Sequence, residues 1–316
     1  CRFPVTGRAS SQASQLPHLN VFTIPDVGAG LPAIASSASH KTRGYLSIWR
    51  IFSHSPALHN RCMNTFLAFY QNLGPALTAL VITTFLLAGT VKGVIGLGLP
   101  TVAMGMLGLA MLPAQAAVLL IIPSTVTNLW QLSFGGHLGA LLKRLWPMLL
   151  LIFLGTGLGT LWLGMGSGPW VVRALGAALL VYALSGLFLP TFKVAPRTER
   201  WLGPLCGVIT GIITSATGVF VIPAVPYLQA LGLSRDQLVQ ALGLSFTVST
   251  LALAAGLAWR GALGGGEMGA SLLALVPALL GMWLGQVVRR RISALWFKRG
   301  FFTGMALLGG HLLLAG

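Results

Sequence analysis

The chain has 316 residues, of which 55% are hydrophobic and only 8% are charged, and its mean hydropathy is +0.84. A soluble domain carries about 25% charged residues, so this composition excludes an ordinary soluble domain and a disordered chain. The formal net charge is +16, but the basic residues lie in short gaps between long apolar runs. This is the pattern of cytoplasmic membrane loops and not of a nucleic-acid-binding surface.

Residues 1–62 differ in composition from the rest of the chain. They are rich in Ser, His, Pro and Arg and contain no apolar run long enough to span a bilayer. The first methionine is Met63, and the first long apolar segment follows it closely. We expect 1–62 to be a spurious extension of the gene start or a fragment boundary, with a disordered leader as the alternative, and exclude it from fold reasoning.

Eight apolar segments are long enough, or nearly so, to be transmembrane helices, since about 20 residues cross ~30 Å of hydrocarbon. They are 75–95, 114–134, 145–164, 169–190, 201–218, 237–258, 268–287 and 300–315. Two shorter apolar tracts, 98–112 and 219–233, follow Gly-rich breaks. As helices they would be about 22 Å long, so each is either a tilted or thinned span or a re-entrant piece.

Three clusters of basic residues indicate whether the two short tracts cross the membrane or are re-entrant. They are Lys143 and Arg144; Lys193, Arg197 and Arg200; and Arg289, Arg290, Arg291, Lys298 and Arg299. The positive-inside rule places all three in the cytoplasm, and this requires both short tracts to cross. The sequence therefore predicts an all-α polytopic protein of the cell membrane with about ten transmembrane helices, eight long and two short or broken, and with both termini external.

The two halves of the chain also resemble each other. Leu107-Gly108-Leu109 aligns with Leu231-Gly232-Leu233, and each motif follows a break rich in Gly and Thr, 89–100 and 211–223. Five spans per half is an odd number, so the halves would be inverted relative to one another, as in many secondary transporters. We therefore expect a first repeat at 63–190, a cytoplasmic linker at 191–200 and a second repeat at 201–316. Coincidence between two Gly- and Leu-rich sequences is the alternative.

The segments GTVKGVIGLGLPTVAMGMLGLAMLPAQAAVLL (89–120) and GIITSATGVFVIPAVPYLQALGLSRDQLVQALGLSFTVS (211–249) carry a family resemblance. Each has a glycine-rich break, an apolar stretch with a proline, a Leu-Gly-Leu turn and a helix with small polar residues. In this order they resemble the sulfite exporter TauE/SafE family of membrane transporters, over about 63–316. The resemblance implies export of sulfite, sulfonates or related small anions.

The two breaks are the places where we expect a substrate site near the middle of the bilayer. Backbone N–H groups freed by a break, together with the positive end of a helix, can hold an anion. The candidate residues are Gly93 and Gly96 at the first break, and Thr214, Ser215 and Thr217 at the second. The alternative is that the glycines only pack helices and that the hydroxyls bond carbonyls of their own helix.

Lys92 is the one basic residue beside a break within an apolar run. A charge inside the membrane is costly, which favours a function as counter-charge for an anionic substrate. Snorkelling of the side chain from the inner end of the first span is the alternative.

Polar residues also mark the helix that follows each break. Ser124, Asn128 and Gln131 have the spacing i, i+4, i+7, so they share one helix face, and Ser245 and Ser249 lie in the corresponding helix of the second half. This stripe either faces a transport pathway or joins helices by hydrogen bonds.

The scarcity of acidic residues limits the mechanisms that the chain can use. After Met63 the acidic residues are Glu199, Asp236 and Glu267, all near predicted loops, which argues against a proton relay through buried carboxylates. We expect a small anionic substrate and the lipid bilayer as partners, no nucleic acid, no metal and no cofactor. The alternatives to a transporter are an intramembrane enzyme, for which Cys206 lacks a matched His, and a non-transporting scaffold.

Overall fold

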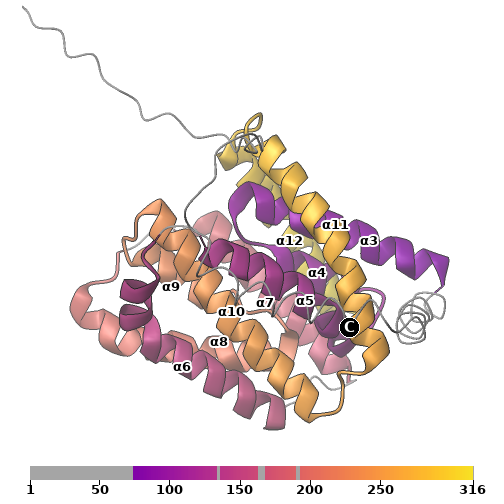
Figure 1. The fold of residues 1–316 in the computed structure, drawn as a ribbon, viewed down its shortest axis with the longest axis horizontal. Coiled ribbons are helices and arrows are strands. Elements are labelled where there is room, and N and C mark those ends of the chain that lie inside the picture. The colour runs from indigo at the N-terminus through magenta and orange to yellow at the C-terminus, as the bar shows by residue number, and fades with distance from the viewer. Residues whose placement is uncertain (1–73, 134–135, 163–167, 190–192, 316) are drawn as a thin grey trace, which may run out of the picture. The chain divides into compact units, whose positions relative to one another are not determined.

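The computed structural model describes residues 74–133, 136–162, 168–189 and 193–315, and the predicted extension 1–62 lies outside them. Within this part the chain forms helices and no strand, so the predicted all-helical class is confirmed (Figure 1). The helices are α3 (Pro75–Ile95), α4 (Leu99–Leu107), α5 (Pro113–Leu132), α6 (Leu138–Trp162), α7 (Pro169–Phe188), α8 (Pro196–Thr217), α9 (Ala224–Ala230), α10 (Arg235–Trp259), α11 (Gly265–Arg289) and α12 (Ala294–Ala315).

Five of these helices, α3, α6, α7, α10 and α11, are long and apolar enough to cross a membrane. Large apolar side chains such as Trp162, Trp259 and Leu314 are more than 80% exposed on the surface. An apolar surface of this extent is unfavourable in water and suits contact with lipid. The described part of the chain therefore has the character of a membrane protein.

Each long segment expected from the sequence corresponds to one long helix, but the ends differ by up to seven residues. Helix α6 begins at Leu138, seven residues before the expected start at 145. Helix α8 begins at Pro196, inside the region 191–200 that the sequence suggests is a linker. In both cases the helix continues into a basic segment, because a helix can extend past the hydrocarbon layer into water.

The two short helices lie in the two short apolar tracts. Helix α4 has nine residues and α9 has seven, which makes them about 14 Å and 10 Å long. Helix α3 ends at Gly96 with φ +80°, and α8 ends at Gly218 with φ +71°. These left-handed conformations favour glycine. Both breaks are shorter than the expected 89–100 and 211–223, because 89–95 and 211–217 are still helical and belong to α3 and α8.

The first helix of each half packs lengthwise on a helix of the other half, α3 on α11 and α8 on α6. A methyl group on Gly89 would collide with the carbonyl of Ala278, one on Gly281 with that of Leu86, and one on Gly285 with that of Thr90. Since residue numbers rise together on both helices, α3 and α11 run parallel. Close backbone contact of this kind is typical of helix pairs in membranes.

Helices α6 and α8 repeat this arrangement. A methyl group on Gly207 would collide with the carbonyl of Met148, and one on Gly211 would lie 2.6 Å from the backbone nitrogen of Thr156. The pair is therefore also parallel.

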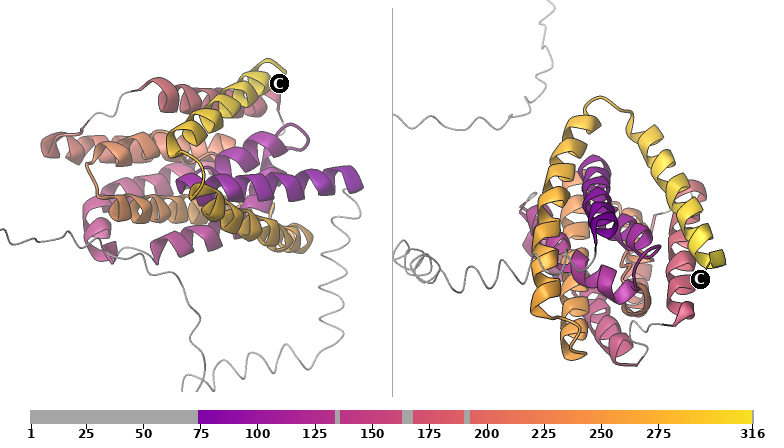
Figure 2. Two further views of the ribbon diagram at one scale, coloured as in Figure 1. Left: turned by 90° about the horizontal axis from the view of Figure 1, so that it is seen from above. Right: turned by 90° about the vertical axis from the view of Figure 1, so that its right-hand side faces the viewer.

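Two further pairs of long helices are antiparallel. Helix α7 packs along α12, with Gly176 near Leu313 and Gly186 against the ring of Phe302. Helix α5 packs on α10, where a methyl group on Gly243 would lie 2.9 Å from Cβ of Gln131. Figure 2 shows α11 alongside α3, while α12 turns away from α11 and lies near α7.

Candidate functional site

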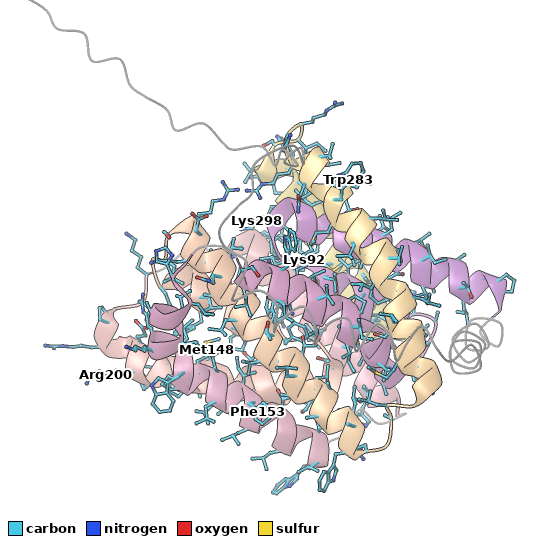
Figure 3. The ribbon with its side chains drawn as sticks, viewed as in Figure 1. Lys92, Met148, Phe153, Arg200, Trp283 and Lys298 are labelled. Carbon is cyan, nitrogen blue, oxygen red and sulfur yellow. The ribbon has the colours of Figure 1, made fainter. Side chains whose placement is uncertain are left out.

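Lys92 lies in the last turn of α3, and its side chain points into the protein. It is 3% exposed, and its Nζ donates to Thr127 Oγ1 at 2.9 Å and to Asn128 Oδ1, both on α5. Figure 3 shows Lys92 among the helices, whereas Arg200 projects outward. The side chain does not snorkel, and of the two interpretations of Lys92 the geometry favours an interior role.

Hydrogen bonds continue from Lys92 through α5 to α10. Asn128 Nδ2 donates to Ser124 Oγ at 3.1 Å, and Ser124 Oγ lies 3.2 Å from Thr250 Oγ1. The network of Lys92, Thr127, Asn128, Ser124 and Thr250 thus joins three helices, and we call it the Lys92 network.

Gln131 ties the first break to α5. Its Nε2 donates to the carbonyl of Gly96 at 2.5 Å, while the N–H of Gly96 donates to the carbonyl of Lys92 at 2.8 Å. The Gly96 amide is therefore not available to a ligand. Gln131 Oε1 is buried and has no hydrogen-bond partner among the described residues, which leaves a polar atom for a ligand or a water.

The charge of Lys92 has no counterpart nearby. Within the described part of the chain the one ion pair is Arg144–Glu199, with Nε and Oε1 2.7 Å apart. Both acceptors of Lys92 are neutral oxygens. Because burial of an unpaired ammonium is costly, a negatively charged group bound beside Lys92 would offset this cost.

The second break has the same backbone turn without the charge. The Gly218 N–H donates to the carbonyl of Thr214 at 2.8 Å, as Gly96 does to Lys92. The hydroxyls of Thr214, Ser215 and Thr217 each donate to a carbonyl of their own helix at 2.6–2.7 Å. Intrahelical bonding, one of the two interpretations given above, describes the geometry of Thr214 and Ser215. Thr217 Oγ1 also accepts from the N–H of Val219 at 3.2 Å, just past the end of α8.

The remaining candidates form no hydrogen bond with the Lys92 network in the described part of the chain, although Gly93 and Ser249 are chain neighbours of Lys92 and Thr250. Gly93 packs against Met282 and Gly285 of α11. Ser249 Oγ donates to the carbonyl of Ser245 at 3.0 Å, and Ser245 Oγ is buried without a partner among the described residues. The structure therefore brings Lys92, Gly96, Ser124, Asn128 and Gln131 together, and no hydrogen bond in the described part joins Gly93, Thr214, Ser215, Thr217, Ser245 or Ser249 to them.

The family model described as Sulfite exporter TauE/SafE matches residues 81–312, a range that holds both breaks and the whole Lys92 network. The chain belongs to the sulfite exporter TauE/SafE family. This confirms the resemblance found in the two break segments. No curated protein and no solved structure matches the chain. Members of the TauE/SafE family are membrane transporters rather than enzymes, so this chain is a multi-pass protein of a transporter family.

Two further side chains of this TauE/SafE protein support the site, and the sequence analysis does not identify either of them. Ser271 Oγ donates to the carbonyl of Leu119 at 2.9 Å and accepts from the N–H of Ile122 at 3.1 Å. Gln240 accepts from the N–H of His137 at 3.0 Å and donates to the carbonyl of Leu132 at 2.9 Å. A proline inside a predicted helix indicates that one carbonyl needs a partner, but no local pattern identifies which side chain supplies it.

Proposed function

We propose that this TauE/SafE protein is a secondary transporter of the plasma membrane that exports a small anion such as sulfite or an organosulfonate. The observation that carries the proposal is the buried Lys92 ammonium beside a helix break, bonded only to neutral oxygens in the described part. Membership of a family of membrane anion exporters supports the same class of cargo.

The Lys92 network offers donors to such a cargo. An ammonium has three N–H donors, and Lys92 uses two of them on Thr127 and Asn128. The third N–H is available to an anion, which would also offset the buried charge. Asn128 and Ser124 would hold the ammonium in place, and Gln131 would keep the break at Gly96 in its position.

The directions of the helices support ten passes across the membrane. Helix α10 is antiparallel to α5 and joins α11 through the short connection 260–264. Since α11 runs parallel to α3, helices α3 and α5 run in the same direction. The segment that contains α4 would then bring the chain back across the membrane, and by the same argument so would the segment with α9.

The same directions support two inverted repeats. Helix α3 begins the first half and α8 the second. Helix α6 is parallel to α8 and also to α10, because His137 bonds Gln240 near the start of α6 and α10 and Arg260 bonds the Thr160 carbonyl near their ends. Since α10 runs opposite to α5 and hence to α3, α8 also runs opposite to α3. The three basic clusters would then lie at one end of the bundle, which we assign to the cytoplasm. In this arrangement the break after α3 and the break after α8 both face the core of the bundle. Of the two, only the break after α3 has a charged side chain beside it, that of Lys92.

A flux assay in proteoliposomes tests the proposal. Lys92→Gln keeps a long polar side chain but removes the charge, and we expect it to lower sulfite flux at least about tenfold, given the cost of losing a buried charge partner. Lys92→Arg should keep part of the flux, and Lys143→Gln, which removes an exposed charge of α6, should keep all of it. Equal flux for Lys92→Gln and the wild type would overturn the assignment of Lys92.

A further inference from the structure

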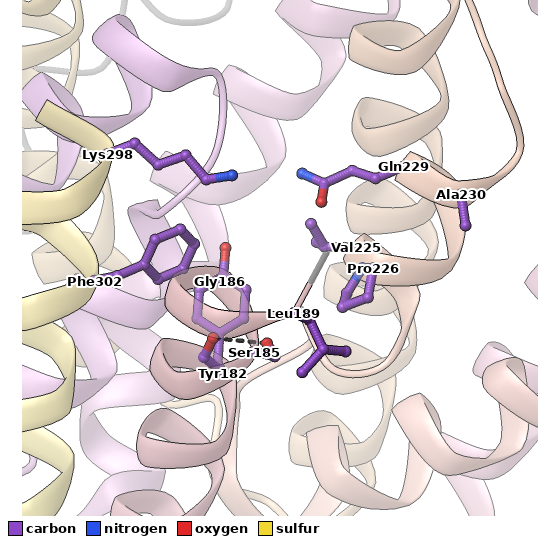
Figure 4. Close-up of a pocket in the computed structure, with 10 residues that line it drawn as sticks. All are labelled: Tyr182, Ser185, Gly186, Leu189, Val225, Pro226, Gln229, Ala230, Lys298 and Phe302. Carbon is purple, nitrogen blue, oxygen red and sulfur yellow. Dashed lines mark hydrogen bonds between the residues drawn. The ribbon is translucent and has the colours of Figure 1, made fainter. Parts of the chain in front are cut away.

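A small cavity lies between the end of α7, helix α9 and the first turns of α12, and none of the residues that line it belongs to the Lys92 network. Its volume is about 50 Å³, and its polar wall is formed by Tyr182, Gln229 and Lys298. Figure 4 shows Lys298 and Gln229 reaching toward each other from opposite walls, with the phenol ring of Tyr182 below and its hydroxyl pointing toward them. Three polar groups from three helices therefore converge on one space.

The hydroxyl of Tyr182 has no hydrogen-bond partner among the described residues although the residue is only 2% exposed. A buried tyrosine usually places its O–H on a partner. Its ring is fixed by edge contacts, with centroids 5.2 Å from Phe302 and 6.4 Å from Phe301. Gly186 leaves the room that Phe302 occupies, so the packing holds the phenol in a position where its own hydroxyl stays unpaired.

The charge of the cavity is positive. Lys298 Nζ lies 5.6 Å from the centroid of Phe302 and forms no ion pair within the described part of the chain. None of the ten residues that line the cavity is acidic. Ser185 also lines it, but its hydroxyl already donates to the carbonyl of Tyr182 at 2.7 Å. The free donors are thus an ammonium, a phenol O–H and the amide of Gln229.

We propose that this cavity is a second anion site, which binds a small inorganic oxyanion such as sulfite through Lys298, Tyr182 and Gln229. A single water needs about 10–15 Å³ of such space, so the cavity has room for an ion of a few atoms. It lies at the end of the bundle that carries the basic clusters, where cargo would arrive before export. A role of this cavity in taking up cargo before export rests on the proposed function. The binding of an oxyanion in the cavity does not depend on it.

Equilibrium binding of radiolabelled sulfite to the purified full chain in nanodiscs tests this site. We expect the wild type to bind two ions, and Tyr182→Phe and Lys298→Gln to bind one each. Tyr182→Phe keeps the aromatic packing and removes only the hydroxyl, and an unchanged thermal midpoint would show that it folds. The matched control is Arg299→Gln, which removes the neighbouring exposed charge over Trp296 and should leave two ions bound.

The outcomes separate this site from the Lys92 network. If Tyr182→Phe and Lys298→Gln both bind as many ions as the wild type, the second site is overturned. A wild type that binds one ion, lost in Lys92→Gln, overturns it as well. If Lys92→Gln still binds two ions while Tyr182→Phe binds one, the second site stands and the assignment of Lys92 fails.

Discussion

Ser271 compensates for the proline inside α5. Pro123 has no N–H, so the carbonyl four residues earlier, that of Leu119, loses its partner within the helix. Ser271 of α11 donates to this carbonyl and accepts from the N–H of Ile122. Pro123 directly precedes Ser124, so this single hydroxyl holds the backbone immediately before the Lys92 network.

Replacement of Ser271 by Ala should therefore destabilise the protein. The change leaves the Leu119 carbonyl and the Ile122 N–H without their side-chain partner, which costs about 1–3 kcal/mol for each buried group left unpaired. Thermal unfolding in detergent micelles measures this as a lower midpoint. Thr83→Ala removes an exposed hydroxyl that bonds its own helix and is the control. A midpoint for Ser271→Ala equal to that of Thr83→Ala would contradict this account of the Pro123 break.

The sequence identifies part of this site at the residue scale. The spacing of Ser124, Asn128 and Gln131 predicts one polar face, and all three lie at or beside the Lys92 network. The direction of the Lys92 side chain could not be predicted, because a long side chain in a last helical turn can reach either the core or the interface. The hydroxyls of Thr214, Ser215 and Thr217 could not be assigned either, since a helical Ser or Thr always has a carbonyl of its own helix in reach.

At the scale of the elements, glycines define which helices pair. On α3 and α11, Gly89, Gly281 and Gly285 each lie against backbone of the opposite helix. Backbone cannot move aside as a flexible side chain can. The sequence shows the apolar runs and hence the helices, but not these pairs, because a glycine does not specify which backbone will approach it. The expected start of α6 at 145 is wrong for a related reason, since Lys143 and Arg144 indicate a loop although they lie within α6.

Gly281→Ala should separate α3 from α11. The added methyl would collide with the carbonyl of Leu86, and overpacking of this kind costs about 1–3 kcal/mol. We expect a lower thermal midpoint and a reduced sulfite flux, because α3 carries Lys92. Gly304→Ala is the matched control, since nothing lies within 4 Å of its added methyl, and alanine favours a helix over glycine. Equal midpoints for the two variants would show that the α3–α11 contact can relax.

For the whole molecule, the distribution of charge predicts how transport responds to voltage. The three acidic residues of the described part lie in the first turns of α8, α10 and α11. None is placed to carry protons through the core of the bundle. Movement of an anion without a compensating proton transfers net charge, and a membrane potential that is negative inside favours its exit.

Efflux from proteoliposomes should therefore increase when a potassium diffusion potential makes the interior negative. A potential of 100 mV contributes about 2.3 kcal/mol per charge, which corresponds to roughly a fiftyfold ratio of anion concentration at equilibrium. Reversal of the potential should slow efflux, and a proton gradient without a potential should have little effect. Flux that ignores the potential but follows a proton gradient would contradict this mechanism.

The parallel pairing of α3 with α11 also has a consequence for biogenesis. Translation produces α3, with its row of small residues, before α4 to α10 and therefore long before α11, the helix that covers this row. Until α11 has been inserted, the strip around Gly89 has no helix packed on it, and Gly93, next to Lys92, lacks its partners Met282 and Gly285. A nascent chain that stops after α10 would leave α3 without the helix it packs on, so the packing of α3 waits for the insertion of α11.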